Sequence, residues 1–151
     1  MGDGRRGGDE DPFRRAWHRA SDGVQTNFEF EGTLLSGLDK LKQTVRAFGT
    51  TVASTTNYSY SNLLPAIEVT VKSDLRTGAD NLLEKTTVFD GFGRATRDQV
   101  KNGAGWIYTH RIYDAANRVW KSSNPASIAV CNTATPCNFT ETSYDSAGRP
   151  L

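Results

Sequence analysis

Three hexapeptides that each place an aspartate four residues before an arginine are the strongest candidates for chemistry in this sequence. In each one, an aromatic residue and Asp are followed by two variable residues, then Gly or Asn, then Arg. The residues that carry this pattern are Phe89, Asp90, Gly93, Arg94, Tyr113, Asp114, Asn117, Arg118, Tyr144, Asp145, Gly148 and Arg149. Calcium loops gather several oxygens, whereas each hexapeptide offers one Asp beside a cation. We therefore favour a structural role for the Asp–Arg pair over a site for a metal ion or a sugar.

Residues of the kinds used in catalysis are few and scattered. There is no G-x-S-x-G, H-E-x-x-H or P-loop motif. His110 lies in the alternating run Trp106–Tyr113, which favours a strand residue over a general base. Two cysteines, Cys131 and Cys137, and two histidines far apart in the sequence, His18 and His110, are not expected to assemble a four-ligand zinc site. We predict no enzymatic activity, no cofactor and no metal; the cysteines form either a local disulfide or two free thiols.

Backbone geometry explains why these residue types stand at these positions of the hexapeptide. A type I turn favours Asp at its first position, where the carboxylate accepts hydrogen bonds from backbone amides. A hairpin loop of this kind needs a left-handed residue at its fourth position, and both Gly and Asn tolerate that conformation. The aromatic residue then ends one strand. The arginine begins the next strand, close enough to the Asp for an ion pair or to a neighbouring ring for a cation–π contact.

The segments between these turns have the composition of strands. Ile67–Lys72 and Trp106–Thr109 alternate apolar and polar residues, which is typical of a half-buried strand. Turn-forming residues separate such runs at Arg76–Asn81 and Lys101–Gly105. The sequence therefore predicts an all-β fold made of consecutive antiparallel β-hairpins.

The overall composition excludes several classes of protein. The chain has 151 residues, 36% of them hydrophobic and 23% charged, with a net charge of +1. These values are not those of a disordered chain, and they give no general attraction to nucleic acid or an anionic membrane. No apolar run approaches the roughly 20 residues of a transmembrane helix, and Met1–Glu10 shows no signal peptide. We expect no nucleic-acid partner and no transmembrane segment.

Composition changes near residue 21. Residues 1–20 contain five Arg and four acidic residues among glycines. They are predicted to be a basic leader that is disordered, or a short helix in which Asp11 is the cap and Phe13 and Trp17 share a face. A less favoured hypothesis is that this helix touches membrane or nucleic acid. Residues 21–151 are predicted to be the repeat region, with clear copies over 84–151.

Two degenerate copies of the hexapeptide extend the repeat over about residues 28–83. Tyr60–Pro65 keeps the aromatic residue, and Leu35–Lys40 keeps an apolar first residue and a final cation. A second pattern competes here: Leu34, Leu38, Leu41, Val45 and Phe48 form a helical stripe. The repeat register instead places Leu41–Phe48 on a strand, and the sequence leaves helix or strand open for residues 36–48.

The hexapeptides resemble the YD repeat of bacterial Rhs proteins, wall-associated proteins and the animal teneurins. Tyr144–Leu151 and Tyr113–Val119 are closest to the family pattern, while Phe89 and Asn117 are mild departures. The resemblance implies hairpins that wind into a spiral strip, which closes as a hollow β-shell in complete members. In bacterial toxins such a shell encloses a C-terminal effector. Carbohydrate binding is also associated with the repeat.

The resemblance implies a structural wall segment of a secreted or cell-surface protein. Its expected partners are the remainder of the same shell, an encapsulated effector and glycans. The strand after Asp145–Gly148 stops at Leu151, which we interpret as a truncation within the shell. The alternative is a stand-alone carbohydrate-binding module that stacks sugars on Trp106, Tyr108 and Trp120.

Overall fold

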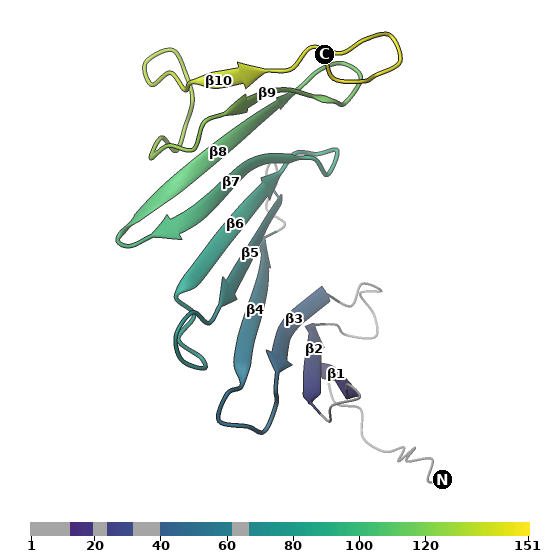
Figure 1. Cartoon of the computed structure of the whole chain (residues 1–151), viewed down its shortest axis with the longest axis vertical. Helices are drawn as coiled ribbons and strands as arrows, with labels where there is room; N and C mark the ends of the chain where they lie inside the picture. The colour runs from purple at the N-terminus through teal and green to yellow at the C-terminus, as the bar shows by residue number, and fades with distance from the viewer. Residues whose placement is uncertain (1–12, 20–23, 32–39, 62–66) are drawn as a thin grey trace.

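The protein is an all-β strip, seen here in a computed structural model (Figure 1). The structure describes residues 13–19, 24–31, 40–61 and 67–151, and only the backbone of residues 13–17, 19 and 31. The strands are β1 (Phe13–Arg19), β2 (Gln25–Glu31), β3 (Lys40–Arg46), β4 (Ser54–Ser61), β5 (Ile67–Ser73), β6 (Leu83–Phe89), β7 (Ala95–Asn102), β8 (Gly105–Tyr113), β9 (Val119–Ser123) and β10 (Phe139–Glu141). No helix occurs in the part of the chain that the structure describes.

The ten described strands form one sheet whose order is the order of the chain. Each strand is hydrogen-bonded to the next, and every pair is antiparallel. The predicted all-β class and the succession of antiparallel strands are therefore confirmed. Because each strand pairs with its sequence neighbours, β1 and β10 lie at opposite ends of a twisted strip (Figure 1).

Strand β1 corrects the interpretation of the N-terminal segment. A short helix or a disordered leader was predicted for residues 1–20, and residues 13–19 are a strand instead. All seven residues of β1 pair with β2, from Phe13 opposite Glu31 to Arg19 opposite Gln25. A helix of about eight residues is marginal in water, whereas a ladder to an available edge satisfies the backbone groups. Residues 1–12 and 20 lie outside the described residues.

Strand β3 decides part of the ambiguity at residues 36–48. Lys40–Arg46 is a strand between β2 and β4, so the helical alternative is wrong for these seven residues. The strand ends in a turn in which Ala47 and Gly49 have positive φ angles of 53° and 79°. Residues 36–39 lie outside the described residues.

Strand β8 changes its pairing partner along its length, and a loop segment returns to the sheet at this place. Its first part pairs with β7 up to His110, and its last three residues pair with β9. Where β9 has diverged, residues 124–138 fold back toward β8. Ala126 exchanges two backbone hydrogen bonds with Tyr108, at 2.7 and 3.1 Å. The 124–138 segment is thereby fixed against the sheet.

The sheet buries very little. Val88 on β6, at 8% exposure, is the only buried apolar side chain among the described residues. Two hydroxyls are buried with hydrogen-bond partners: the Oγ1 of Thr86 lies 2.8 Å from that of Thr70, and the Oγ of Ser123 accepts the backbone amide of His110. The strands are thus held mainly by their ladders and by cross-strand side-chain contacts.

Candidate functional site

The three hexapeptides form the same turn. In each, the Asp amide donates to the Arg carbonyl at 2.9–3.0 Å, and the amide of the fifth residue donates to the Asp carbonyl at 3.0 Å. The fifth residue has positive φ in every copy, with values for Gly93, Asn117 and Gly148 of 76°, 63° and 80°. The ladder slips by one residue at Phe89 and at Tyr113, as in a turn followed by a bulge. The predicted turn geometry is confirmed at all three positions.

The aspartate side chain organises each turn, as Asp114 illustrates. Its Oδ1 accepts the backbone amides of Ala116 and Arg118 at 2.9 Å, and its Oδ2 accepts the Arg118 Nε at 2.8 Å. Asp90 and Asp145 make the same three bonds at 2.7–3.0 Å. Most of the acceptor capacity of each carboxylate is already used. Little remains for a cation or a sugar hydroxyl.

These hydrogen bonds favour the charged form of the three carboxylates. The Arg118 amide lowers the pKa of Asp114, and the Arg149 amide lowers the pKa of Asp145, each aided by the arginine side chain of its own turn. At Asp90, desolvation opposes ionisation, but hydrogen bonds from Arg94 outweigh it and the pKa is lowered. The turns are therefore built around ionised aspartates.

The arginines of the first two turns each contact the tyrosine of the next turn. The Arg94 guanidinium carbon lies 4.6 Å from the ring centroid of Tyr113, and the Tyr113 hydroxyl donates to the Ala95 carbonyl at 2.8 Å. The next step repeats this arrangement. Arg118 lies 4.4 Å from the Tyr144 ring, and the Tyr144 hydroxyl donates to the Val119 carbonyl at 2.8 Å.

A degenerate copy makes the same step with a lysine. The Lys40 ammonium lies 5.3 Å from the Tyr60 ring centroid, and the Tyr60 hydroxyl donates to the Leu41 carbonyl at 2.9 Å. Lys40 and Tyr60 are the final cation and the first aromatic residue of the two degenerate copies. We call the contacts Lys40–Tyr60, Arg94–Tyr113 and Arg118–Tyr144 the cation–tyrosine ladder. Residues 62–66, which include most of the Tyr60–Pro65 copy, lie outside the described residues.

The three aromatic residues predicted to stack on sugars do not form one site. Trp106 and Tyr108 lie two residues apart on β8, so they share a face of the sheet. Trp120 is on β9, 43% exposed, with the Lys121 ammonium 4.2 Å from its ring centroid. Its neighbour Val119 pairs with Tyr113, seven residues along β8 from Trp106, or roughly 20 Å. Glycan stacking on these residues stays a prediction.

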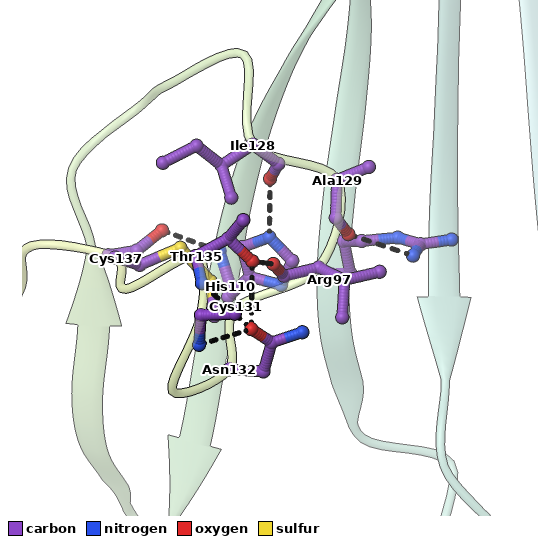
Figure 2. The surroundings of a disulfide bond; sticks show 11 residues. Arg97, His110, Ile128, Ala129, Cys131, Asn132, Thr135 and Cys137 are labelled. Carbon is purple, nitrogen blue, oxygen red and sulfur yellow. Dashed lines mark hydrogen bonds between the residues drawn. A yellow bond between two sulfur atoms is a disulfide. The ribbon is translucent and has the colours of Figure 1, made fainter.

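The two cysteines form a disulfide beside β8, which decides between the two states that the sequence left open. Their Cα atoms are 5.3 Å apart and their sequence separation is six. His110 on β8 points toward this loop, and its Nε2 lies 3.0 Å from the Ile128 carbonyl (Figure 2). A ring nitrogen of His110 and both sulfurs lie within 4.8 Å of one another.

A pocket of about 400 Å³ adjoins the disulfide. Residues of β5, β6, β7, β8 and β10 and of the cysteine loop line it, among them Glu68, Arg97, His110, Arg111, Cys131 and Phe139. Arg97 is held over the pocket wall by a hydrogen bond from its Nη1 to the Ala129 carbonyl at 3.3 Å. Its Nε is buried without a hydrogen-bond partner.

Sequence reasoning missed this cluster. His110 was assigned to a strand, correctly, whereas the two cysteines and the two histidines were not expected to assemble a four-ligand zinc site. The proximity arises from the return of residues 124–138 to β8, for which the sequence carries no local signal. The turn residues, in contrast, were found because their chemistry is local.

The part of the chain that the structure describes has no helix of the length and apolarity needed to cross a membrane. No protein-family model matches this chain, and neither curated proteins nor solved structures provide a match.

Proposed function

We propose that this chain is a non-catalytic wall segment of a YD-repeat protein that is secreted or displayed on the cell surface. Its role is to extend a β-strip that encapsulates or displays another part of the protein. The partners of the segment are then the neighbouring repeats of the same shell. The complete shell would enclose an effector or bind a surface glycan.

The observation that carries this proposal is the cation–tyrosine ladder. The Arg94 and Arg118 steps each join one turn to the following turn through a ring contact and a hydroxyl hydrogen bond. Lys40 and Tyr60 make the same two contacts between β3 and β4. A step needs only a cation, a tyrosine and the carbonyl after the cation, so the same contact can be repeated along a strip of any length. Such side-by-side addition suits a wall.

The sparse core supports the same proposal. A free-standing domain buries one face of its sheet against another layer. Among the described residues, large apolar side chains such as Leu83, Val100 and Ile112 remain 41–47% exposed. The strip gains stability from lateral contacts between strands rather than from a second layer. This is the behaviour expected of one panel of a larger closed surface.

The alternative function is a stand-alone carbohydrate-binding module. Trp106 and Tyr108 share a face of β8 and could present two rings to one sugar chain. Trp120 lies too far away to join them, which weakens the hypothesis. Glycan binding that is lost in Trp106→Ala at unchanged stability would favour the module over the wall.

The test is to identify the native polypeptide that contains this chain. Antibodies raised against the 151-residue chain are used on cytoplasmic, envelope and medium fractions of the source cells. We expect a polypeptide well above 16.6 kDa in the envelope or the medium. Peptide mass spectrometry should find further Tyr-Asp turns in it, and negative-stain images should show a hollow particle.

A cytoplasmic enzyme serves as the lysis control for the fractionation. A polypeptide of 16.6 kDa confined to the cytoplasm would contradict the proposal. A large polypeptide that contains further Tyr-Asp turns but forms a solid particle would contradict the hollow shell. It would still agree with a YD-repeat protein.

A further inference from the structure

The cluster of His110, Cys131 and Cys137 has the composition of a metal site. Thiolate sulfur and imidazole nitrogen are the ligands that Zn²⁺ prefers. One ring nitrogen of His110 and the two sulfurs lie within 4.8 Å of one another. Zinc–ligand distances of about 2.0–2.3 Å place ligand atoms of a tetrahedral site roughly 3.5 Å apart. The two sulfurs, which the disulfide holds at bonding distance, must therefore separate after reduction while the ring nitrogen approaches them.

The hydrogen bond of His110 leaves the other ring nitrogen available. The Nε2 faces the Ile128 carbonyl at 3.0 Å (Figure 2), and a carbonyl oxygen can only accept. In the neutral ring Nε2 therefore carries the proton, and Nδ1 carries the lone pair. A backbone carbonyl on one nitrogen and a metal on the other is the usual arrangement of a zinc-bound histidine.

The cysteine loop is held by bonds that do not involve sulfur. The Asn132 Oδ1 accepts the amides of Ala134 and Thr135 at 2.9 and 2.8 Å, and the Thr135 hydroxyl donates to the Val130 carbonyl at 2.8 Å. Asn132 also donates its amide to the Thr135 carbonyl. The loop can therefore keep Cys131 and Cys137 close together after the disulfide is reduced.

The pocket supplies the remaining requirements. Three protein ligands leave the fourth position of a tetrahedral zinc to solvent, and the cluster opens on a pocket of about 400 Å³. The Arg97 guanidinium lines the same pocket. Because Zn²⁺ with two thiolates is neutral, the arginine does not oppose the loaded site.

We propose that reduction of the Cys131–Cys137 disulfide converts this pocket into a zinc site with His110, Cys131 and Cys137 as its protein ligands. A small-molecule thiol supplies the electrons: two thiols become one disulfide while the Cys131–Cys137 bond becomes two cysteine thiols. Zn²⁺ then displaces both thiol protons to solvent and binds the His110 lone pair. The site fills in a reducing cytoplasm and empties when an oxidising compartment reforms the disulfide.

The experiment compares metal binding by the reduced and oxidised full chain. A phosphine, which does not compete for zinc as a thiol would, reduces the protein. We expect one Zn²⁺ per reduced chain in competition with a chromophoric chelator, and none per oxidised chain. Co²⁺ should give thiolate charge-transfer bands, and X-ray absorption at the zinc edge should count two sulfurs.

His110→Gln and Cys131→Ser test the ligands, with His18→Gln on β1 as the matched control because His18 is exposed. Each ligand variant should lose at least about 100-fold in zinc affinity, beyond the usual effect of removing an outer-shell partner. His18→Gln should bind like the unmodified chain. Circular dichroism of every reduced variant checks that the sheet is intact.

Equal zinc affinity of the reduced and oxidised chains would overturn the proposal, as would unchanged affinity in a folded His110→Gln. If a ligand variant fails to fold, X-ray absorption of the zinc-loaded unmodified chain tests the proposal instead. Fewer than two sulfurs around the zinc would refute the site.

Discussion

Arg118 makes three kinds of contact, two through its side chain and one through its backbone amide. Its Nε bonds Asp114 at 2.8 Å, its plane covers the Tyr144 ring, and its amide bonds the Asp114 carboxylate. Tyr144 likewise contributes a ring and a hydroxyl. A cation–π contact is worth about 0.5–1 kcal/mol and a hydrogen bond about 1 kcal/mol, so a ladder step contributes about 1.5–2 kcal/mol.

Substitutions at Tyr113 separate the two parts of a step. Tyr113→Phe removes only the hydroxyl bond to the Ala95 carbonyl and should lower the free energy of unfolding by about 1 kcal/mol. Tyr113→Ala also removes the ring under Arg94 and should cost about 2–3 kcal/mol.

Arg118→Ala is the comparison. It removes an ion pair of a side chain that is 37% exposed, worth about 0–1 kcal/mol, and the contact with the Tyr144 ring, worth about 0.5–1 kcal/mol. It should cost less than Tyr113→Ala, because it leaves every aromatic ring and every tyrosine hydroxyl bond in place. Urea titrations at pH 7 measure all three. Equal costs for Tyr113→Ala and Arg118→Ala would show that the ring adds nothing.

The elements of this fold differ in how far a local sequence can specify them. The Asp–Gly turns were predicted because the carboxylate, the left-handed residue and the arginine act within six residues. Strand β1 was missed because its partner β2 is not encoded within residues 13–19, and the spacing of Phe13 and Trp17 also suits a helix. The helical stripe over Leu41 and Val45 misleads for the same reason. Pairing with β2 and β4 determines that this segment is a strand.

The fifth position of the turn can be tested by exchanging residues between copies. Asn117 accepts the Arg94 Nη1 at 2.7 Å, whereas a Cβ at Gly148 would lie 3.9 Å from the Arg118 Nη1. Gly148→Ala forces an alanine to a φ of 80° and should cost about 1–2 kcal/mol. Gly148→Asn should cost less, because Asn tolerates this conformation and gains an acceptor beside Arg118.

Gly93→Asn is the matched control, since no atom lies within 4 Å of its added Cβ. Thermal melts should rank Gly148→Asn above Gly93→Asn and Gly148→Ala. If Gly148→Asn melts no higher than Gly148→Ala, Asn and Gly are not exchangeable at the fifth position of the turn.

The molecule as a whole is a strip stabilised at its turns more than in its interior. Charged turns recur along one sheet of ten described strands, while a single apolar side chain is buried among the described residues. Stability should therefore follow the ionisation of the turn aspartates. Asp80, between β5 and β6, adds to this effect because the amide of Thr77 and its neighbours lowers the pKa of Asp80.

The pKa values of Asp90, Asp114 and Asp145 are lowered in the folded chain, so their contribution is complete above the unfolded value of about 3.9. It is lost as pH falls through the lower folded values. The melting temperature should hardly change between pH 7 and 5 and should fall steadily below about pH 4.

Asp114→Asn keeps one side-chain oxygen but cannot ionise. It should be less stable than the unmodified chain at pH 7, and the difference should shrink at pH 3. A gap that stays constant from pH 7 to pH 3 would show that the charge of Asp114 is irrelevant.

The segment of residues 124–138 shows how tolerant the strip is of added sequence. Two neighbouring turns are 24 residues apart, from Phe89 to Tyr113, and the next two are 31 apart, from Tyr113 to Tyr144. The ring contact is nevertheless nearly the same across both intervals, at 4.6 and 4.4 Å. Extra residues leave the sheet and return to it without disturbing the step. Evolution can therefore insert new loops between turns while the scaffold is retained, and an engineer could place a foreign peptide there.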